Sequence, residues 1–434
     1  MKDLLKQRRL LAVCIFILAW VGLSSAVNAM PAFARQYEVS CALCHAAFPR
    51  LNSFGKSFIT SNYRMPNWRE KIAIDTGDDR IALPKAPPFA LRAQAFVQGR
   101  EAESLNNTNG PTGDNAKFDM QAPYLIKLLS SAPLSDHLTY YLYGIFAEKG
   151  ENGKIIIEDA WIIHDDVFDT GISMQLGQFQ LIDLMFSRET RMTFQDFMAY
   201  RMAGITYERG VLFSRNLGAL AVAIGAANGS GIEQNFAVNS AGFRRPDRLF
   251  DNDSGKTVYG RLGTDIGPVS AGLFGLTGKQ KSANNVTDPT GTAPGARKTT
   301  RQVIGVDVSG VARDNIYWFA QALWNQWDGF LDTDPNRDYK WFGGFAGVDY
   351  IHDDRWTYSL LYNYADAQDF KGTRTLYEGI NINSLTLATA YYFMRNVKGI
   401  IEVNMDFLSK DNDADFVGHE TKENALLLGF DLAF

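Results

Sequence analysis

The sequence ends with Leu426-Leu427-Leu428-Gly429-Phe430-Asp431-Leu432-Ala433-Phe434. Every second residue from position 426 to position 434 is apolar, whereas Gly429 and Asp431 lie between these positions. Because successive side chains of a β-strand point to opposite faces, this segment predicts a strand with one wholly apolar face. The end of the chain therefore points to a fold in which a whole strand face meets apolar surroundings.

Segments of similar character recur upstream, from residue 89 onward. Stretches of about ten residues that alternate in polarity are 89–100, 138–147, 154–163, 257–266, 356–364 and 400–408. The connections alternate between long polar ones (101–118, 228–254, 278–300, 327–339, 366–379 and 409–421) and short ones (130–136, 267–268, 313–315, 352–355 and 395–396). Transmembrane barrels have long loops on one side of the membrane and short turns on the other. The sequence therefore predicts an all-β protein, an antiparallel transmembrane β-barrel of about 16 strands.

The composition agrees with this fold class. The chain has 434 residues, of which 38 are Gly, 8 Trp, 18 Tyr and 29 Phe, and only 21% are charged. With a mean hydropathy of −0.17, it is neither a disordered chain nor a bundle of apolar membrane helices. A soluble β-sandwich is the alternative, but it does not explain the alternating loop lengths.

The first residues have the pattern of a secretory signal peptide. Basic residues precede an apolar run at 10–23, and small residues follow, so we expect cleavage after Ala29 or after Ala34. A membrane anchor is the alternative, but 14 apolar residues are short for a membrane span. Cleavage at 29 removes four of 43 basic residues and one of 48 acidic ones, so the net charge moves from −5 to −8. A chain this acidic is not expected to bind nucleic acid.

The exported chain keeps two cysteines, in Cys41-Ala42-Leu43-Cys44-His45. This spacing is the attachment pattern of one c-type haem, in which both thiols bond to the porphyrin and His45 ligates the iron. A redox-active cysteine pair or a short disulfide is the alternative, but neither requires the His that follows. We therefore expect one covalently attached haem c on Cys41, Cys44 and His45.

The second axial ligand is open. Met65 lies 20 residues after His45, and a thioether ligand would raise the reduction potential. Met65 could equally be ordinary packing, because Met often fills gaps. His137 and His164 are rivals if the barrel supplies the ligand.

These observations predict four parts: a signal peptide at 1–29, a haem segment at 35–80, a Pro-rich hinge at 81–88 and the barrel at 89–434. Some forty residues are too few to cover a haem alone. The N-terminus and the short turns share the periplasmic side, so the pore mouth is the expected cover. We expect the haem segment to form a short cytochrome plug at the periplasmic side of the barrel or within its lumen.

The connection 180–199 is unusually apolar for an exposed loop. It would be the third outer loop, which in general porins folds inward and narrows the pore. Folding inward against the plug is one interpretation, and contact with the outer leaflet or simple loop packing is the other.

The haem motif, the preceding Ala34-Arg35-Gln36-Tyr37 and the following Phe48-Pro49-Arg50-Leu51-Asn52-Ser53-Phe54-Gly55 resemble the porin-fused monohaem cytochromes c of iron-oxidising bacteria. The resemblance extends to the whole layout of signal peptide, single haem motif and barrel. It implies location in the outer membrane of a Gram-negative cell, in contact with outer-membrane lipid. It also implies an oxidoreductase that oxidises extracellular Fe(II) and passes one electron through the haem to a periplasmic c-type cytochrome or similar carrier.

The resemblance provides no residue for contact with Fe(II). Acidic loop residues could attract cations, namely Asp328, Asp332 and Asp334, and Asp411, Asp413 and Asp415 near His419, although exposed acidic runs are usually only solvated. Two other functions stay as alternatives: electron export to extracellular acceptors, and a solute porin in which the haem segment is a gate or a sensor.

Overall fold

The computed structural model describes residues 32–65, 73–74, 76–78, 83–84, 88–100, 118–148, 155–229, 255–288, 291, 293–394, 396–408 and 424–433. The predicted signal peptide lies outside these residues. So do Asp411, Asp413, Asp415 and His419.

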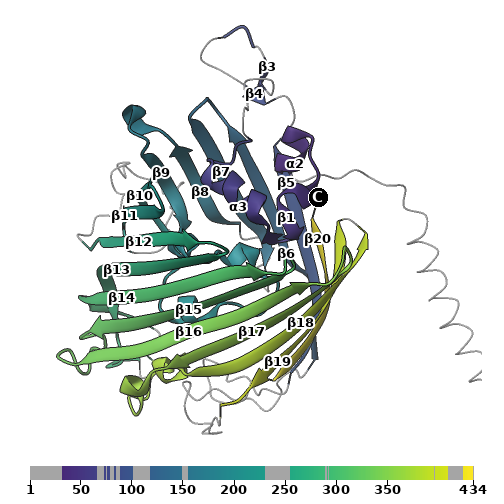
Figure 1. Cartoon of the computed structure of the whole chain (residues 1–434). Coiled ribbons are helices and arrows are strands. Elements are labelled where there is room, and N and C mark those ends of the chain that lie inside the picture. The colour runs from purple at the N-terminus through teal and green to yellow at the C-terminus, as the bar shows by residue number, and fades with distance from the viewer. Residues whose placement is uncertain are drawn as a thin grey trace, which may run out of the picture.

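Sixteen antiparallel strands close into one barrel, in which the last strand, β20, pairs with the first barrel strand, β5 (Figure 1). The strands are β5 Phe89–Arg100, β6 Phe118–Pro133, β7 Leu138–Glu148, β8 Ile156–His164, β9 Ser173–Gln180, β10 Tyr207–Leu217, β11 Leu220–Ala227, β12 Thr257–Ile266, β13 Val269–Ala283, β14 Pro294–Ala312, β15 Ile316–Asp328, β16 Asp338–Ile351, β17 Trp356–Asp366, β18 Ile382–Met394, β19 Val397–Asp406 and β20 Ala425–Ala433. Closure leaves no free edge in this sheet. The prediction of a 16-strand all-β barrel is confirmed.

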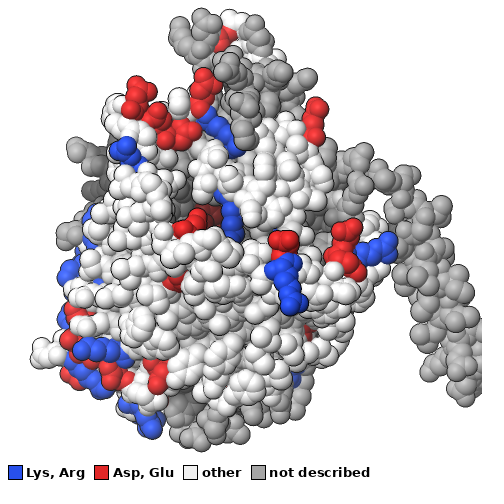
Figure 2. All heavy atoms as spheres, in the orientation of Figure 1, with Lys and Arg blue, Asp and Glu red and all other residues white. Residues whose placement is uncertain are grey.

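The apolar face of the last strand points out of the barrel. Leu426, Leu428 and Phe430 are 45%, 43% and 51% exposed, whereas Leu427 and Asp431 are 4% and 3% exposed. In Figure 2 the outer wall is almost free of charge, and charged side chains gather mostly toward the strand ends. This apolar outer wall is the surface that a membrane-spanning barrel presents to lipid. Among the described residues, no helix is long and apolar enough to cross a membrane.

The predicted alternation of turns and loops is confirmed, with one shortened loop. Strands β13 and β14 continue to the pair Ala283 and Pro294, so much of the connection predicted at 278–300 is paired strand. This part of the sequence contains polar residues such as Lys279 and Lys281. Lys279 and Lys281 are paired with residues of β14, in a part of the sheet that extends beyond the apolar wall. Strand residues there are polar like loop residues, so polarity does not distinguish strand from loop.

The residues before the barrel form a small unit, which we call the plug. It consists of α2 Ala32–Tyr37, η1 Cys41–Leu43, β1 His45–Ala47, β2 Arg50–Leu51 and α3 Ser53–Thr60. Figure 1 shows it at the end of the barrel that also holds the C-terminus, where the short turns lie. Within the predicted hinge, β4 Leu83–Pro84 pairs with β3 Ala73–Ile74 as a separate two-stranded sheet.

The connection between β9 and β10 folds into the lumen, and we call residues 181–206 the inner loop. It contains η3 Leu181–Leu184, η4 Arg188–Thr190 and α4 Met198–Met202. Leu181 and Ile182 are fully buried, and Phe197 stacks on Phe345 of β16 with ring centroids 4.3 Å apart. The inward interpretation of this apolar loop is therefore confirmed, and contact with the outer leaflet is wrong. The core of this protein lies inside the barrel.

Candidate functional site

The two cysteines of the predicted haem motif lie at a single tight turn of the plug. Cys41 begins η1, and the backbone N–H of Cys44 donates to the Cys41 carbonyl at 3.2 Å. Ser40 caps the turn by accepting from the Ala42 N–H at 3.3 Å. Both thiols are free and half-buried, and the apolar side chain of Leu43 between them is exposed. An apolar group bound to both sulfurs would cover this exposed surface.

His45 is held so that one ring nitrogen is left for a ligand. Its Nδ1 lies 3.2 Å from the Pro49 carbonyl oxygen, to which Nδ1–H donates in the neutral tautomer. Phe48 packs against the ring at 5.3 Å between centroids. Metal-binding His residues are oriented in this way, with one nitrogen on a carbonyl and the other on the metal. Two free thiols and an oriented imidazole fit the donor set of a c-type haem.

The residues after the motif pack helix α3 against it. Asn52 caps α3 by accepting from the Gly55 N–H at 2.9 Å, and its side-chain amide donates to the Leu43 carbonyl at 3.0 Å. A Cβ at Gly55 would collide with the carbonyl oxygen of Cys44. The Asn and the Gly therefore hold α3 directly against the haem-binding turn.

The plug reaches both sides of the lumen. On one side, Tyr63 contacts Tyr141 of β7 and Trp161 of β8 at 5.6 and 5.5 Å between ring centroids. On the other side, Arg50 forms an ion pair with Asp349 of β16. In the order of the closed sheet, β8 and β16 are eight strands apart and thus lie opposite one another. The plug therefore bridges the pore instead of resting on one wall.

A third anchor is the backbone of Phe48. Its carbonyl oxygen accepts from Lys398 Nζ at 2.8 Å and from the Tyr392 hydroxyl at 2.7 Å. The guanidinium of Arg92 lies over the Phe48 ring, 5.3 Å from its centroid. These contacts attach the segment next to His45 to β5, β18 and β19.

The three candidates for the distal ligand, Met65, His137 and His164, do not contact His45 in the described part of the chain. Met65 is half-buried at the end of the described plug. His137 and His164 stack on each other at 5.6 Å, and their Nδ1 atoms contact Asp165 Oδ1 and the Asp166 N–H. Within the part of the chain that the structure describes, none of the three forms a hydrogen bond or ring contact with His45. That part also holds no group of three or more His, Cys, Asp or Glu side chains that could bind a metal ion.

The charged contacts that fix the inner loop are not among those that the sequence predicts. Glu189 accepts from Lys127 Nζ at 2.8 Å and from the Tyr143 hydroxyl at 2.9 Å, and it lies 3.7 Å from Arg92. Arg92 also forms an ion pair with Asp431 at 2.8 Å. Arg92 thus joins the inner loop, the plug and the last strand. The only signal in the sequence was the lone Asp431 on the inward face of an otherwise apolar strand.

A second charged cluster lies within the inner loop. Asp196 pairs with Arg188 and with Arg191, the latter at 3.6 Å. Burial would raise the pKa of Asp196, but the two arginines outweigh it and lower this pKa to about 2. Asn363 of β17 donates to the Asp196 carbonyl at 3.0 Å. The loop is therefore tied to the wall opposite its own strands.

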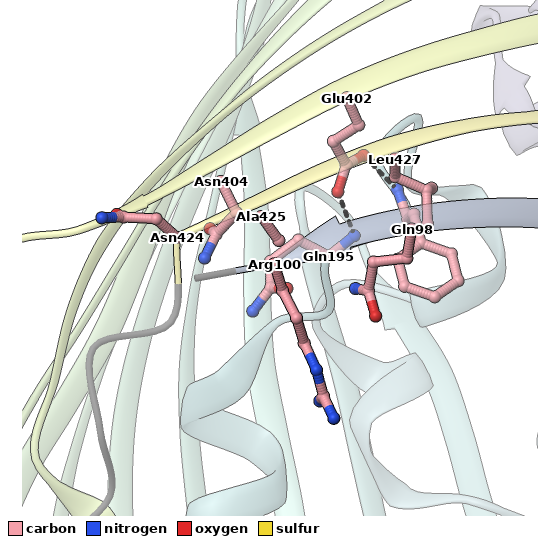
Figure 3. Close-up of a pocket in the computed structure, with 9 residues that line it drawn as sticks. Gln98, Arg100, Gln195, Glu402, Asn404, Asn424, Ala425 and Leu427 are labelled. Atoms are coloured by element: carbon pink, nitrogen blue, oxygen red, sulfur yellow. Dashed lines mark hydrogen bonds between the residues drawn. The ribbon is translucent and has the colours of Figure 1, made fainter. Parts of the chain in front are cut away.

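The inner loop is also tied to β19. Glu402 accepts from the N–H groups of Phe194 at 2.6 Å and Gln195 at 2.8 Å, as the dashed lines in Figure 3 show. A cavity of about 80 Å³ beside this contact is lined by Gln98, Arg100, Phe194, Gln195, Glu402, Asn404, Asn424, Ala425 and Leu427. Glu402 uses both carboxylate oxygens to hold the loop, so this cavity is mainly a gap between loop and wall.

The acidic cluster of Asp328, Asp332 and Asp334 lies at the connection between β15 and β16. Asp332 forms an ion pair with Arg297 at 3.0 Å, and Asp328 accepts from Gln326 Nε2 at 2.8 Å. The charge of Asp332 is therefore balanced within the protein, which weakens its role in attracting cations.

Comparison with solved structures places the barrel among porins. An OmpF of Salmonella typhi, solved with daunomycin, matches with a TM-score of 0.51 and 13% identity over 80% of this chain and 97% of that chain. An anion-selective porin from Comamonas acidovorans matches with a TM-score of 0.50 and 13% identity, over 80% and 98%. OmpT of Vibrio cholerae, in its trimer form, matches with a TM-score of 0.50 and 12% identity over 80% of this chain and 98% of that chain.

Comparison by sequence adds nothing to this. No protein-family model matches, and no curated protein matches the sequence. At identities this low the structural likeness shows the fold alone. The chain therefore has a porin-like, 16-strand outer-membrane β-barrel fold.

Proposed function

We propose that this protein conducts single electrons across the outer membrane, oxidising extracellular Fe(II) and reducing a periplasmic c-type cytochrome or similar carrier. The observation that carries the proposal is the seating of the Cys41–His45 motif in a plug that bridges opposite walls of the barrel. A filled lumen suits the passage of electrons better than the passage of solutes.

The residues that would hold the redox centre are Cys41 and Cys44, through thioether bonds, and His45, through Nε2. Haem c bound there would supply one reversible electron at a potential set by its ligands. Pro49 would orient the imidazole through its carbonyl oxygen. We propose Met65 as the distal ligand, with His137 and His164 as the rivals.

The chain itself would separate the inside of the cell from the site of oxidation. The plug and the inner loop both cross the lumen and meet at Arg92, which contacts Phe48 and Glu189. Fe(III) is poorly soluble near neutral pH, so oxidation at the outer side would leave the precipitate outside the cell. An anchored plug would thus pass charge while retaining ions.

The layout supports membership of the porin-fused monohaem cytochromes. The flanking residues Phe48, Arg50, Asn52 and Gly55 each make a contact that seats the plug or its helix. A haem segment with these flanks, followed by a single porin-like barrel, is the arrangement of that family.

The fold favours a second candidate, a solute channel in the outer membrane with the plug as its gate or sensor. The anion-selective porin from Comamonas acidovorans shares the barrel over 80% of this chain. Electron export to extracellular acceptors is the same chemistry in the opposite direction. The reduction potential separates export from iron oxidation, because oxidation requires a potential above that of the iron couple.

The test uses lipid vesicles that contain the purified haem-loaded protein and enclose an oxidised soluble c-type cytochrome. Fe(II) is added outside under anaerobic conditions, and the absorption of the enclosed cytochrome is followed. Reduction with wild-type protein, and none with a Cys41→Ala/Cys44→Ala variant, is the expected result. Equal, slow reduction with both proteins would mean that Fe(II) leaks through a channel, and would favour the solute porin.

A further inference from the structure

Two carboxylates that form no ion pair within the described residues lie in the lumen, between the inner loop and the wall; the Ser187 side chain is hydrogen-bonded to one of them, Asp183. Asp159, on β8, is 5% exposed, and its Oδ1 has no hydrogen-bond partner in the described part of the chain. Asp183, on η3, is exposed although Leu181 and Ile182 before it are fully buried, so it faces an accessible space inside the barrel. Strands β8 and β9 are paired, with Ala160 opposite Gln178, and η3 follows β9 directly, so Asp159 and Asp183 come from adjoining elements at the outer end of this strand pair. The two carboxylates repel each other electrostatically.

The neighbouring positive charges are already committed to other acids. Lys127 pairs with Glu158 and Glu189, at 3.2 and 2.8 Å. Arg188 pairs with Asp196. Within the described residues, neither Asp159 nor Asp183 takes part in an ion pair. Two adjacent carboxylates in such a place repel each other unless a proton or a cation joins them.

A third oxygen completes the set. Gln180, the last residue of β9, is 2% exposed, and its Oε1 has no hydrogen-bond partner among the residues that the structure describes. Its Nε2 donates to the Tyr207 hydroxyl, which lies within electrostatic reach of both Asp159 and Asp183. This buried amide oxygen is not part of the acidic pair, yet no donor among the described residues reaches it either.

We propose that Asp159, Asp183 and the Gln180 amide oxygen form a luminal binding site for a hydrated divalent cation. Carboxylate and amide oxygens are the ligands that hard divalent cations prefer, and an ion held by one or two carboxylates keeps several of its waters. The side chain of Asp183 is exposed, so such waters can reach it. Glu158 and Glu189 are not included as ligands, because both accept from Lys127 Nζ and Glu189 also lies 3.7 Å from Arg92.

The position of the site gives it a role. Asp159 lies two residues before Trp161 on β8, and Trp161 contacts Tyr63 of the plug. Two residues of a strand span about 7 Å. Because β8 runs from the outer side toward the short turns, Asp159 lies on the outer side of this contact. The site would therefore hold a cation arriving from outside directly against the plug, and its identification as Fe²⁺ rests on the proposed function.

The test measures binding of Mn²⁺ to the haem-loaded, detergent-purified protein, by the loss of the free-ion electron paramagnetic resonance signal. Mn²⁺ has the same charge and oxygen preference and does not reduce haem, so binding is read without activity. We expect one bound ion whose affinity falls at least tenfold in Asp159→Asn/Asp183→Asn. Asp183→Asn alone, in an accessible loop position, should fold normally and weaken binding. Asp334→Asn, in an outer loop, is the matched control and should change nothing.

Two results would overturn the proposal: no Mn²⁺ binding by the wild-type protein near neutral pH, or equal binding by the wild type and Asp183→Asn. The first would mean that the two carboxyl groups share a proton instead. Failure of the proposed cation site can be distinguished from failure of the proposed function. Reduction of the haem by Fe(II) without Mn²⁺ binding would contradict the cation site alone, and Mn²⁺ binding without reduction would contradict iron oxidation alone.

Discussion

Arg50 of the plug forms an ion pair with Asp349 on the luminal face of β16, and the two side chains are only 12% and 3% exposed. The guanidinium also lies over the ring of Phe319, 5.1 Å from its centroid. Phe186 of the inner loop contacts the same ring at 5.7 Å. Plug, inner loop and wall therefore meet around one pair of charges, on the wall opposite Trp161.

Loss of this pair should loosen the plug. Removing one partner of a buried ion pair costs about 3–5 kcal/mol, because the other charge stays buried without compensation. We expect Arg50→Ala to raise the frequency of open-channel events in planar bilayers at least tenfold over the wild type.

The matched control for Arg50→Ala is Arg313→Ala, in an exposed turn between β14 and β15. It should leave the conductance unchanged. Wild-type protein that already conducts as an open pore would show that the plug does not close the barrel.

Gly55 should be required for attachment of the haem. A Cβ at this position would collide with the Cys44 carbonyl oxygen, which is backbone and cannot move without distorting the haem-binding turn. The overpacking should cost about 1–3 kcal/mol, so Gly55→Ala should lower the haem content per barrel severalfold.

Haem staining against total protein measures this content. Gly275→Ala, where no atom lies within 4 Å of the new Cβ, should load normally. Full loading of Gly55→Ala would show that α3 has room to shift without harm.

The cysteines should matter for the haem and not for the barrel. Cys41→Ala/Cys44→Ala should lose all covalent haem, since both thioether bonds are gone, while the sixteen paired strands are untouched. Haem staining after denaturing electrophoresis, together with the heat-dependent mobility of a folded barrel, measures both. Normal staining of the variant would contradict the assignment of the motif.

The inner loop should loosen in acid. The folded-state pKa of Asp196 lies at about 2, below its usual 3.8, because Arg191 and Arg188 outweigh the effect of burial. Because the pKa is lowered in the folded state, the ionised Asp196 stabilises the fold at pH values above 3.8, and this stabilisation is lost as the pH falls toward 2. The difference between the two pKa values corresponds to about 2 kcal/mol. Hydrogen exchange of residues 181–206 should therefore accelerate in the wild type as pH falls through this range, after correction for the intrinsic rate.

Asp196→Asn is the comparison for the acid effect. In this variant the backbone amides of residues 181–206 should exchange faster than in the wild type at neutral pH, and their exchange rate should change little further as the pH falls. An inner loop that stays equally protected from neutral pH down to about 2 would mean that the Asp196 contacts add nothing to its stability.

The alternating segments predicted this barrel well because the lipid imposes a period of two on every strand. The segments predicted at 89–100 and 257–266 coincide with β5 and β12. Where the ladder leaves the apolar wall, as at Lys279, the constraint ends and the prediction failed. Contacts between Arg50 and Asp349, 299 residues apart, depend on barrel closure and plug position, which no local pattern encodes.

The most direct test of the central claim is an anaerobic titration of the oxidised, detergent-purified protein with Fe(II), followed through the haem absorption bands. Our account predicts rapid reduction by one equivalent of Fe(II) per haem. Absence of reduction by Fe(II), with full reduction by dithionite, would contradict iron oxidation and favour electron export or a gated porin.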